Sequence, residues 1–408
     1  MDARTYVASV AEESLGLAAG SLKPETVPDE LVSGFSSALR GEATAGAEGP
    51  LLERLMLSPV LAAARDAALS EDGYLVRKAR WPGAAPFAVC LTHDVDNISR
   101  PRSHLWRTRS RFSAPELVAG LLGLVSLYDN VKLLAKGEGS RGFHSSFYYL
   151  SSNYPLGAVR PESDRIRASG WDVGLHGDFG THDSQEKMDE AVTRFSGAMG
   201  FRPTGLREHY LRFDFAKSWP IMEAAGFDYD TTVGTNDRLG FKIGMASPFH
   251  PPDGAWSPMN LLELPLVLMD TTLWGYLKRS EEEGFSDSLR MMKDVEDVEG
   301  LFTLLWHQEA VRMKGGRIYW RLLDEIARRG CFVGSGAEIS RWWRSRSTPL
   351  VKRGNLIRLD GQPPHGLVLR LNLAEGRTPR VSSGSIERRG DEYLVRPEGP
   401  DFALEVDH

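Results

Sequence analysis

The stretch FAVCLTHDVDN at residues 87–97 decides how the rest of the sequence is interpreted. Residues 87–92 form a short, nearly continuous apolar run, which is typical of a β-strand covered on both faces. Two carboxylates, Asp94 and Asp96, follow this run directly. In α/β folds, side chains at the carboxyl ends of parallel strands face a shared ligand cleft. The stretch therefore predicts a buried strand that brings two acids to a cleft.

Similar apolar runs recur at 145–150, 171–175, 261–266, 301–306 and 331–334. Helical patterns lie between several of them, over 183–200, 214–225 and 317–329. Strands that alternate with helices indicate parallel β/α units. We therefore expect residues 81–345 to form one α/β unit, either a barrel or an open sheet.

The two ends of the chain have different patterns. Residues 1–80 carry apolar positions at three- and four-residue spacing, which predicts a helical region. Residues 346–408 alternate in period two around Gly, Pro and Asp, which predicts a small β-rich domain. Three units are therefore expected, with boundaries near residues 80 and 345.

Composition and charge limit the classes of function. The chain has 408 residues, 41% of them hydrophobic, and a formal net charge of −6. Its overall charge therefore does not favour nucleic acid or an anionic membrane as a partner. Cys90 and Cys331 lie far apart and outside any C-x-x-C pattern, which argues against a disulfide framework or a thiolate zinc site. No secretory signal is visible at the start, so we expect a cytoplasmic location.

Residues 100–128 combine charge with apolar character. Residues 100–111 contain five arginines and one Trp, which predicts a solvated loop or, alternatively, a contact to an anion such as a substrate phosphate. The apolar stretch at 117–128 is too short to span a bilayer, so we expect no transmembrane segment. It could instead form a buried or an interfacial helix.

Polar side chains follow three further predicted strands. His176 ends the run at 171–175, and His182 lies six residues further on. Arg207 lies in GLREHYLR at 205–212, and His307 follows the run at 301–306. Because these endings belong to one predicted β/α unit, we expect the side chains to converge on one cleft.

These residue types suit hydrolysis assisted by a metal. Two acids as close as Asp94 and Asp96 would repel unless a cation or a proton separates them, so one can bind a metal while the other accepts protons from water. Imidazole suits zinc and its first-row neighbours. An arginine such as Arg207 would keep a carboxylate ionised and oriented, and His307 titrates in the range that suits a general acid.

The order and character of these motifs resemble the polysaccharide deacetylase family, the NodB-homology group of carbohydrate esterase family 4. The resemblance covers roughly residues 81–345, with T-H-D-V-D at 92–96 in place of the family's usual T-F-D-D-G. It implies a distorted (β/α) barrel and a divalent metal held by Asp-His-His, most often Zn²⁺, with Co²⁺ or Ni²⁺ as alternatives. By this match Asp94 would be the catalytic base, and Asp96 and His176 would bind the metal.

The chain departs from the family pattern at two positions. Gly180 stands where the second histidine of H-x-x-x-H is expected, so the resemblance leaves the third ligand to His182, to Asp178 or to water. His209 stands where the R-x-P motif has proline, and it could be an extra ligand or a substrate contact.

The resemblance also assigns roles to the remaining site residues. Arg207 would orient Asp94, His307 would be the general acid, and Asp230 would tune or orient His307. A backbone N–H near Tyr210 would share the oxyanion. Three aromatic side chains could stack on a sugar ring, namely Tyr210, Trp274 and Trp306.

The function implied is metal-dependent hydrolysis of an N-acetyl group on an amino sugar or a glycan intermediate. One alternative is hydrolysis of a small non-sugar amide, because related barrels act on such substrates. Another is a non-catalytic protein that binds a glycan on the same fold.

Overall fold

The computed structural model describes residues 1–42 and 49–407, and its centre is a sheet of parallel strands. Strand β2 (Ala88–Val95) pairs with β9 (Leu301–Leu305) along its first five residues. Its start also pairs with β10 (Phe332–Gly334), and its end pairs with β3 (Ser146–Leu150). Val89 and Leu91 belong to one core cluster, and Ala88 and Cys90 to another. The strand is therefore buried on both faces, as the sequence predicts.

The strands of this sheet follow the order β7-β6-β5-β4-β3-β2-β9-β8, with β10 beside β2. The other members are β4 (Asp172–Gly177), β5 (Gly205–Glu208), β6 (Tyr229–Asp230), β7 (Leu262–Glu263) and β8 (Leu266–Met269).

The two ends of this order lie close together, because β7 and β8 are separated in the chain only by Leu264 and Pro265. Near this junction the Leu266 N–H donates to the Val233 carbonyl at 2.9 Å. The sheet therefore curls back on itself, and the predicted distorted (β/α) barrel is confirmed.

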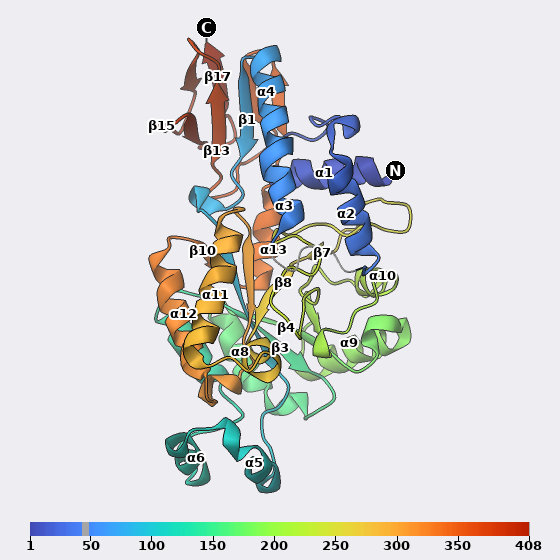
Figure 1. Cartoon of the computed structure of the whole chain (residues 1–408), viewed down its shortest axis with the longest axis vertical. Helices are drawn as coiled ribbons and strands as arrows, with labels where there is room; N and C mark the ends of the chain where they lie inside the picture. Colours follow the sequence, from blue (N-terminus) through green and yellow to red (C-terminus); the bar gives the residue numbers. More distant parts are fainter. Residues whose placement is uncertain (43–48, 408) are drawn as a thin grey trace.

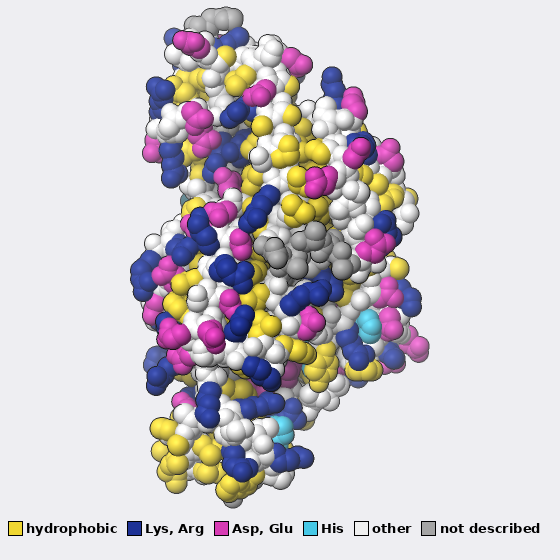
Figure 2. All heavy atoms as spheres, in the orientation of Figure 1, with side chains coloured by type: hydrophobic (Ala, Val, Ile, Leu, Met, Phe, Trp, Pro, Cys, Tyr) yellow, Lys and Arg dark blue, Asp and Glu magenta, His cyan; other side chains and the backbone are white. Residues whose placement is uncertain are grey.

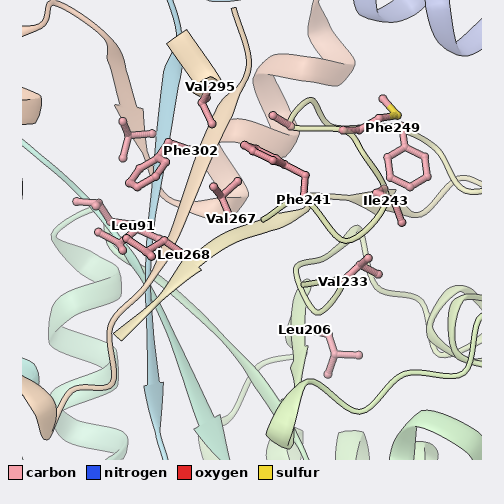
Figure 3. Close-up of a cluster of buried hydrophobic side chains, with 14 of the residues drawn as sticks. Leu91, Leu206, Val233, Phe241, Ile243, Phe249, Val267, Leu268, Val295 and Phe302 are labelled. Carbon is pink, nitrogen blue, oxygen red and sulfur yellow. The ribbon is translucent and has the colours of Figure 1, made fainter. Parts of the chain in front are cut away.

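Helices cover the outside of the barrel. They are α7 (Val131–Gly139), α8 (Arg160–Ala168), α9 (Gln185–Met199), α10 (Ser218–Ala224), α11 (Glu281–Glu296), α12 (Gly316–Arg328) and α13 (Gly336–Ser345). Short 3-10 or π turns lie at Leu156–Ala158, Thr181–Asp183, His209–Leu211, Thr272–Tyr276 and Ala310–Arg312. Figure 3 shows how Leu91, Leu268 and Phe302 gather in the apolar core.

The described part of the N-terminal region consists mainly of helices as far as residue 71. It contains α1 (Ala3–Leu15), α2 (Asp29–Leu39), α3 (Leu51–Leu55), a π turn (Met56–Val60) and α4 (Leu61–Glu71), with a 3-10 turn at Pro24–Thr26. Strand β1 (Tyr74–Lys78) and a 3-10 turn (Pro82–Ala84) follow.

The C-terminal β strands form two four-stranded sheets, and one of them includes β1. The first has the order β1-β13-β16-β15, with β13 (Leu369–Leu373), β16 (Glu392–Arg396) and β15 (Ser385–Arg389). The second contains β11 (Leu350–Arg353), β12 (Leu356–Leu359), β17 (Ala403–Asp407) and β14 (Thr378–Val381). The expected β unit at 346–408 therefore takes one strand from the region that the sequence predicted as helical.

Residues 102–121 form a helical hairpin at the end of the molecule opposite the C-terminal strands (Figure 1). It consists of α5 (Arg102–Thr108), a 3-10 turn (Arg109–Arg111) and α6 (Ala114–Leu121). The solvated loop expected over 100–111 is therefore wrong, because most of it is helical. Among the described residues, no helix is both long and apolar enough to cross a membrane.

Candidate metal centre and catalytic cleft

A cavity of about 620 Å³ opens at the carboxyl ends of the barrel strands. Its lining includes Asp94, Asp96, His176, His209, Asp270 and His307. Asp94 lies in β2 and His176 in β4, while the other four follow the ends of β2, β5, β8 and β9. Of the side chains expected to converge, Asp94, Asp96, His176 and His307 therefore line one cavity, whereas Arg207 and His182 do not line it.

Asp96, His176 and His209 offer one ligand atom each within 4.8 Å of one another. His176 Nε2 lies 3.2 Å from Asp96 Oδ1, and His209 Nε2 lies 3.8 Å from the same oxygen. Asp96 Oδ1 and His176 Nε2 are buried and have no hydrogen-bond partner among the described residues. Buried polar atoms are normally satisfied, so this pair points to a missing charged partner.

The protonation of the two histidines suits a cation. His176 Nδ1 donates to the Arg207 carbonyl at 2.8 Å, which leaves the Nε2 lone pair directed into the cleft. Burial lowers the pKa of His176, but the Asp94 and Asp96 carboxylates raise it by more. These carboxylates therefore attract positive charge to the position where a metal would bind.

Burial and the neighbouring His176 lower the pKa of His209 to about 4. His209 is thus neutral near pH 7, as a metal ligand must be. The residues present fit a divalent cation held by one carboxylate and two imidazoles, a donor set that suits zinc and its neighbours.

Gly177, directly after His176, allows the strand ends to approach. A Cβ on Gly177 would lie 2.1 Å from Glu208 Oε2 on the neighbouring strand. Burial raises the pKa of Glu208 well above its usual value, and its Oε2 accepts from the Thr181 hydroxyl at 2.5 Å. A larger residue at position 177 would push β4 away from β5 and displace His176.

Asp94 lies beside the three candidate ligands. Its Oδ2 is 3.6 Å from His176 Nε2, and its Oδ1 is 3.5 Å from Arg207 Nη1. Arg207 is fully buried and is held by the carbonyl and the hydroxyl of Thr231, at 3.0 and 2.8 Å. The fixed guanidinium therefore lies directly beside the Asp94 carboxylate.

His307 faces the cluster from the opposite side of the cleft. Its Nδ1 donates to Asp270 Oδ1 at 2.7 Å, and its backbone N–H donates to Asp270 Oδ2 at 2.9 Å. Burial lowers the pKa of His307, but the Asp270 carboxylate, together with Asp96 and Asp94, more than offsets this and raises it to about 10. Nε2, 3.9 Å from Asp96 Oδ2, is thus a protonated group at the cleft.

Asp270, rather than Asp230, is the carboxylate that contacts His307. Asp230 is fully buried and accepts from the Thr232 hydroxyl and backbone N–H, at 2.6 and 3.1 Å. The expectation that Asp230 orients His307 is therefore corrected. The apolar run at 261–266 predicts a single strand, and this prediction leaves Asp270 outside the expected site. Pro265 divides the run, and the second strand ends at Met269, directly before Asp270.

His182 does not lie among the candidate ligands. Its Nε2 is 3.9 Å from Asp183, and its carbonyl accepts from the Ser218 hydroxyl at 2.7 Å. Asp178 is engaged by Ser151, Ser152 and Arg194. The geometry therefore assigns the third position to His209, which corrects the expectation for His182.

The three aromatic candidates lie in different environments. Tyr210 is 67% exposed, stacks on His209 with ring centroids 3.9 Å apart, and lines the cavity together with Trp274. Trp306 is fully buried against Trp274 and Tyr319, so it is not available to a sugar ring. Tyr210 also has a left-handed backbone (φ 60°), a conformation that is costly for a residue with a side chain and that gathers at functional sites.

No protein-family model matches the chain, and no curated protein matches its sequence. Solved structures give matches at low identity. One is named "putative polysaccharide deacetylase from Mycobacterium smegmatis" (17% identity, 67% of this chain and 96% of that chain, TM-score 0.49). A second is Puue allantoinase (18% identity, 66% and 93%, TM-score 0.47). A third is a family 4 carbohydrate esterase from Streptomyces lividans in complex with acetate (14% identity, 62% and 93%, TM-score 0.36).

Proposed function

We propose that this chain is a metal-dependent hydrolase that removes an N-acetyl group from an amino sugar and releases acetate. The observation that carries the proposal is the buried pair Asp96 Oδ1 and His176 Nε2, which lack partners among the described residues. His209 completes a three-ligand set, and a carboxylate and a protonated imidazole flank it. A divalent cation bound there supplies Lewis acidity to an acyl carbonyl and to a water molecule.

The side chains divide the proton transfers between them. Asp94 accepts the proton of the water that attacks the acyl carbon, and Arg207 keeps this carboxylate oriented. A backbone N–H near Tyr210 is the proposed donor to the developing oxyanion. His307 then gives its Nε2 proton to the nitrogen as the C–N bond breaks, which yields acetate and a free amine.

Asp270 supports the acid in this scheme. It accepts a hydrogen bond from the Nδ1–H of His307 and so fixes the ring with Nε2 toward the cleft. The exposed ring of Tyr210 and the cavity-lining Trp274 would cover the apolar face of a pyranose. The mixed lining of acids, imidazoles and aromatic rings suits a sugar better than a purely apolar ligand.

Metal content and acetate release test the proposal together. We expect bound metal by elemental analysis, acetate release from N-acetylated sugars, and retained metal without acetate release in Asp94→Asn. Metal binding without acetate from any sugar would redirect the assignment to another amide. Absence of both metal and turnover would overturn it.

A matched pair of variants tests the ligand set directly. His209→Gln should lower metal affinity by at least about tenfold, whereas His182→Gln should leave it unchanged. Isothermal titration of metal-depleted protein measures both. If His182→Gln lost metal and His209→Gln did not, the third ligand would be His182, as the sequence suggested.

A further inference from the structure

The hairpin α5–α6 and the turn that follows it, at residues 122–124, expose large apolar side chains to solvent. Leu122 is 69% exposed and Leu124 is 74% exposed, and Val118 and Leu121 beside them are also about half exposed. Trp106 on α5 is 62% exposed. Figure 2 shows that apolar atoms gather at this end of the molecule, over α6. A contiguous exposed apolar surface usually marks an interaction site.

Cationic side chains accompany this apolar surface. Arg100, Arg107, Arg109 and Arg111 are exposed and form no ion pair with a described residue. Glu116 is the only acidic residue in the sequence from 98 to 128, and Arg312 neutralises it at 3.1 Å. A chain with a formal charge of −6 therefore concentrates positive charge at the same end as its exposed apolar side chains.

The hairpin is attached to the wall of the catalytic cleft. Phe112 is buried with Leu127 and Tyr128, and it forms a β-bridge with Met313. The Lys314 N–H donates to the Arg111 carbonyl at 2.7 Å. Arg111, Met313 and Lys314 also line the cavity, so the base of the hairpin is part of its rim.

We propose that the α5–α6 hairpin docks on an anionic lipid surface. Leu121, Leu122 and Leu124 enter the boundary between headgroups and acyl chains, as the apolar faces of interfacial helices do. The arginines contact lipid phosphates, and the exposed ring of Trp106 lies at headgroup level. A symmetric contact with a second copy is disfavoured because it would bring the same arginines together.

The position of the hairpin also indicates a substrate class, an inference that rests on the proposed function. Docking places the cleft rim formed by Arg111, Met313 and Lys314 next to the lipid surface. Arg111 and Lys314 outnumber the neighbouring Glu309 at this rim, and they favour an anionic group between the sugar and its anchor. The substrate class is thus an N-acetylated sugar joined through phosphate to a membrane lipid.

Vesicle co-sedimentation tests docking without any need for turnover. The wild-type chain should bind vesicles of phosphatidylcholine with phosphatidylglycerol, and less so as salt rises. The double variant Leu122→Ser, Leu124→Ser should bind at least about tenfold more weakly, because it lacks two leucines that enter the membrane on docking. Val351→Ser removes an exposed apolar side chain on β11, far from the hairpin, and should bind like wild type.

Charge reversal separates lipid from protein partners. Arg107→Glu should weaken binding to the anionic vesicles by at least about fivefold and leave the folded state intact. Failure of wild-type protein to bind these vesicles would overturn docking. Equal binding of the wild type and the leucine variant would also overturn it. So would a dimer in sedimentation equilibrium that the leucine variant abolishes, because a second copy would then cover this face.

The substrate class is tested by comparing two acetylated sugars. Wild type should release acetate faster from N-acetylglucosamine phosphate-linked to a long-chain lipid in vesicles than from free N-acetylglucosamine. The leucine variant should lose the advantage of the vesicle substrate only. The substrate class would be overturned if wild type and the leucine variant released acetate from the vesicle substrate at equal rates. Vesicle binding with no acetate from either sugar would instead overturn the proposed function and leave docking intact.

Discussion

Two histidine–carboxylate pairs, one at the cleft and one in the core, differ in what they leave unpaired. His307 and Asp270 lie 2.7 Å apart at the cleft, and His307 is 20% exposed. His93 and Glu138 lie 2.8 Å apart and are fully buried. His93 is the direct neighbour of Asp94 on β2, and it points to the other face because side chains alternate along a strand.

The buried pair is saturated with partners. His93 Nδ1 lies 2.7 Å from the Trp306 carbonyl, so both ring nitrogens face acceptors. Glu138 also accepts from the hydroxyls of Ser145 and Tyr319, both at 2.6 Å. In the cleft pair, by contrast, His307 Nε2 has as its ion-pair partner among the described residues only the Asp96 carboxylate, 3.9 Å away. A saturated pair supports the fold, whereas a pair with one nitrogen directed at a cleft is available for chemistry.

The largest expected effect is on turnover. His307→Gln should lower kcat for acetate release by about 10²–10⁴-fold, because the leaving amine loses its proton donor. Thermal unfolding should change less than on loss of the Glu138 carboxylate, since His307 is 20% exposed at the cleft whereas Glu138 is fully buried. A loss of stability without a loss of kcat would make the cleft pair structural and break the comparison.

Glu138→Gln should act on stability instead. Removing one partner of a buried ion pair costs about 3–5 kcal/mol of unfolding free energy. Burial raises the pKa of Glu138, but His93 and the donors lower it by more, so the net shift is downward. Its stabilisation is therefore present above its ordinary pKa and lost as the pH falls through the lowered value.

Urea unfolding measures the difference in unfolding free energy between wild type and Glu138→Gln. This difference should be large at about pH 7 and smaller at about pH 3. The kcat of folded Glu138→Gln at low temperature is the control and should stay close to wild type. An unchanged difference across this range would contradict the assigned ionisation.

A smaller effect is expected for Asp270→Asn, about 10–10²-fold in kcat. Without the carboxylate the pKa of His307 falls from about 10 toward its ordinary value, so less of the acid is protonated at alkaline pH. The alkaline limb of the kcat–pH profile should therefore move to lower pH, with metal content unchanged. An unmoved limb would show that Asp270 only packs against His307.

The smallest effect is expected for Tyr319→Phe, which removes one of the hydroxyls that bond Glu138. Unfolding free energy should fall by about 1–3 kcal/mol, with kcat unchanged. Urea unfolding and acetate release measure the two quantities. A drop in kcat without a loss of stability would show that the hydrogen bonds joining Tyr319, Glu138 and His93 to the Trp306 carbonyl affect the neighbouring His307.

Strand-end reasoning located much of the site because buried strands are visible as apolar runs. Asp94, Asp96, His176 and His307 each lie at or just after the end of such a run, whereas Arg207 lies in a short strand that no apolar run marks. The runs at 87–92 and 301–306 correspond to β2 and β9, which pair directly in the barrel.

The rest depends on geometry that no local pattern contains. Pro265 splits one apparent strand into β7 and β8, and this hid Asp270. The choice of His209 over His182 depends on how the chain turns after β4 and β5. The exposure of Leu122 and Leu124 depends on the hairpin standing away from the barrel.

Strand β1 also has a consequence for how the chain is made. Tyr74–Lys78 pairs antiparallel with Leu369–Leu373, so the whole barrel is inserted between two neighbouring strands of one sheet. During synthesis β1 must wait for almost the entire chain before its partner exists, and such long-range pairing is slow. A chain cut before residue 369 would keep a complete barrel sequence yet carry an unpaired strand, a known cause of aggregation. Attempts to isolate the barrel should therefore start after Lys78.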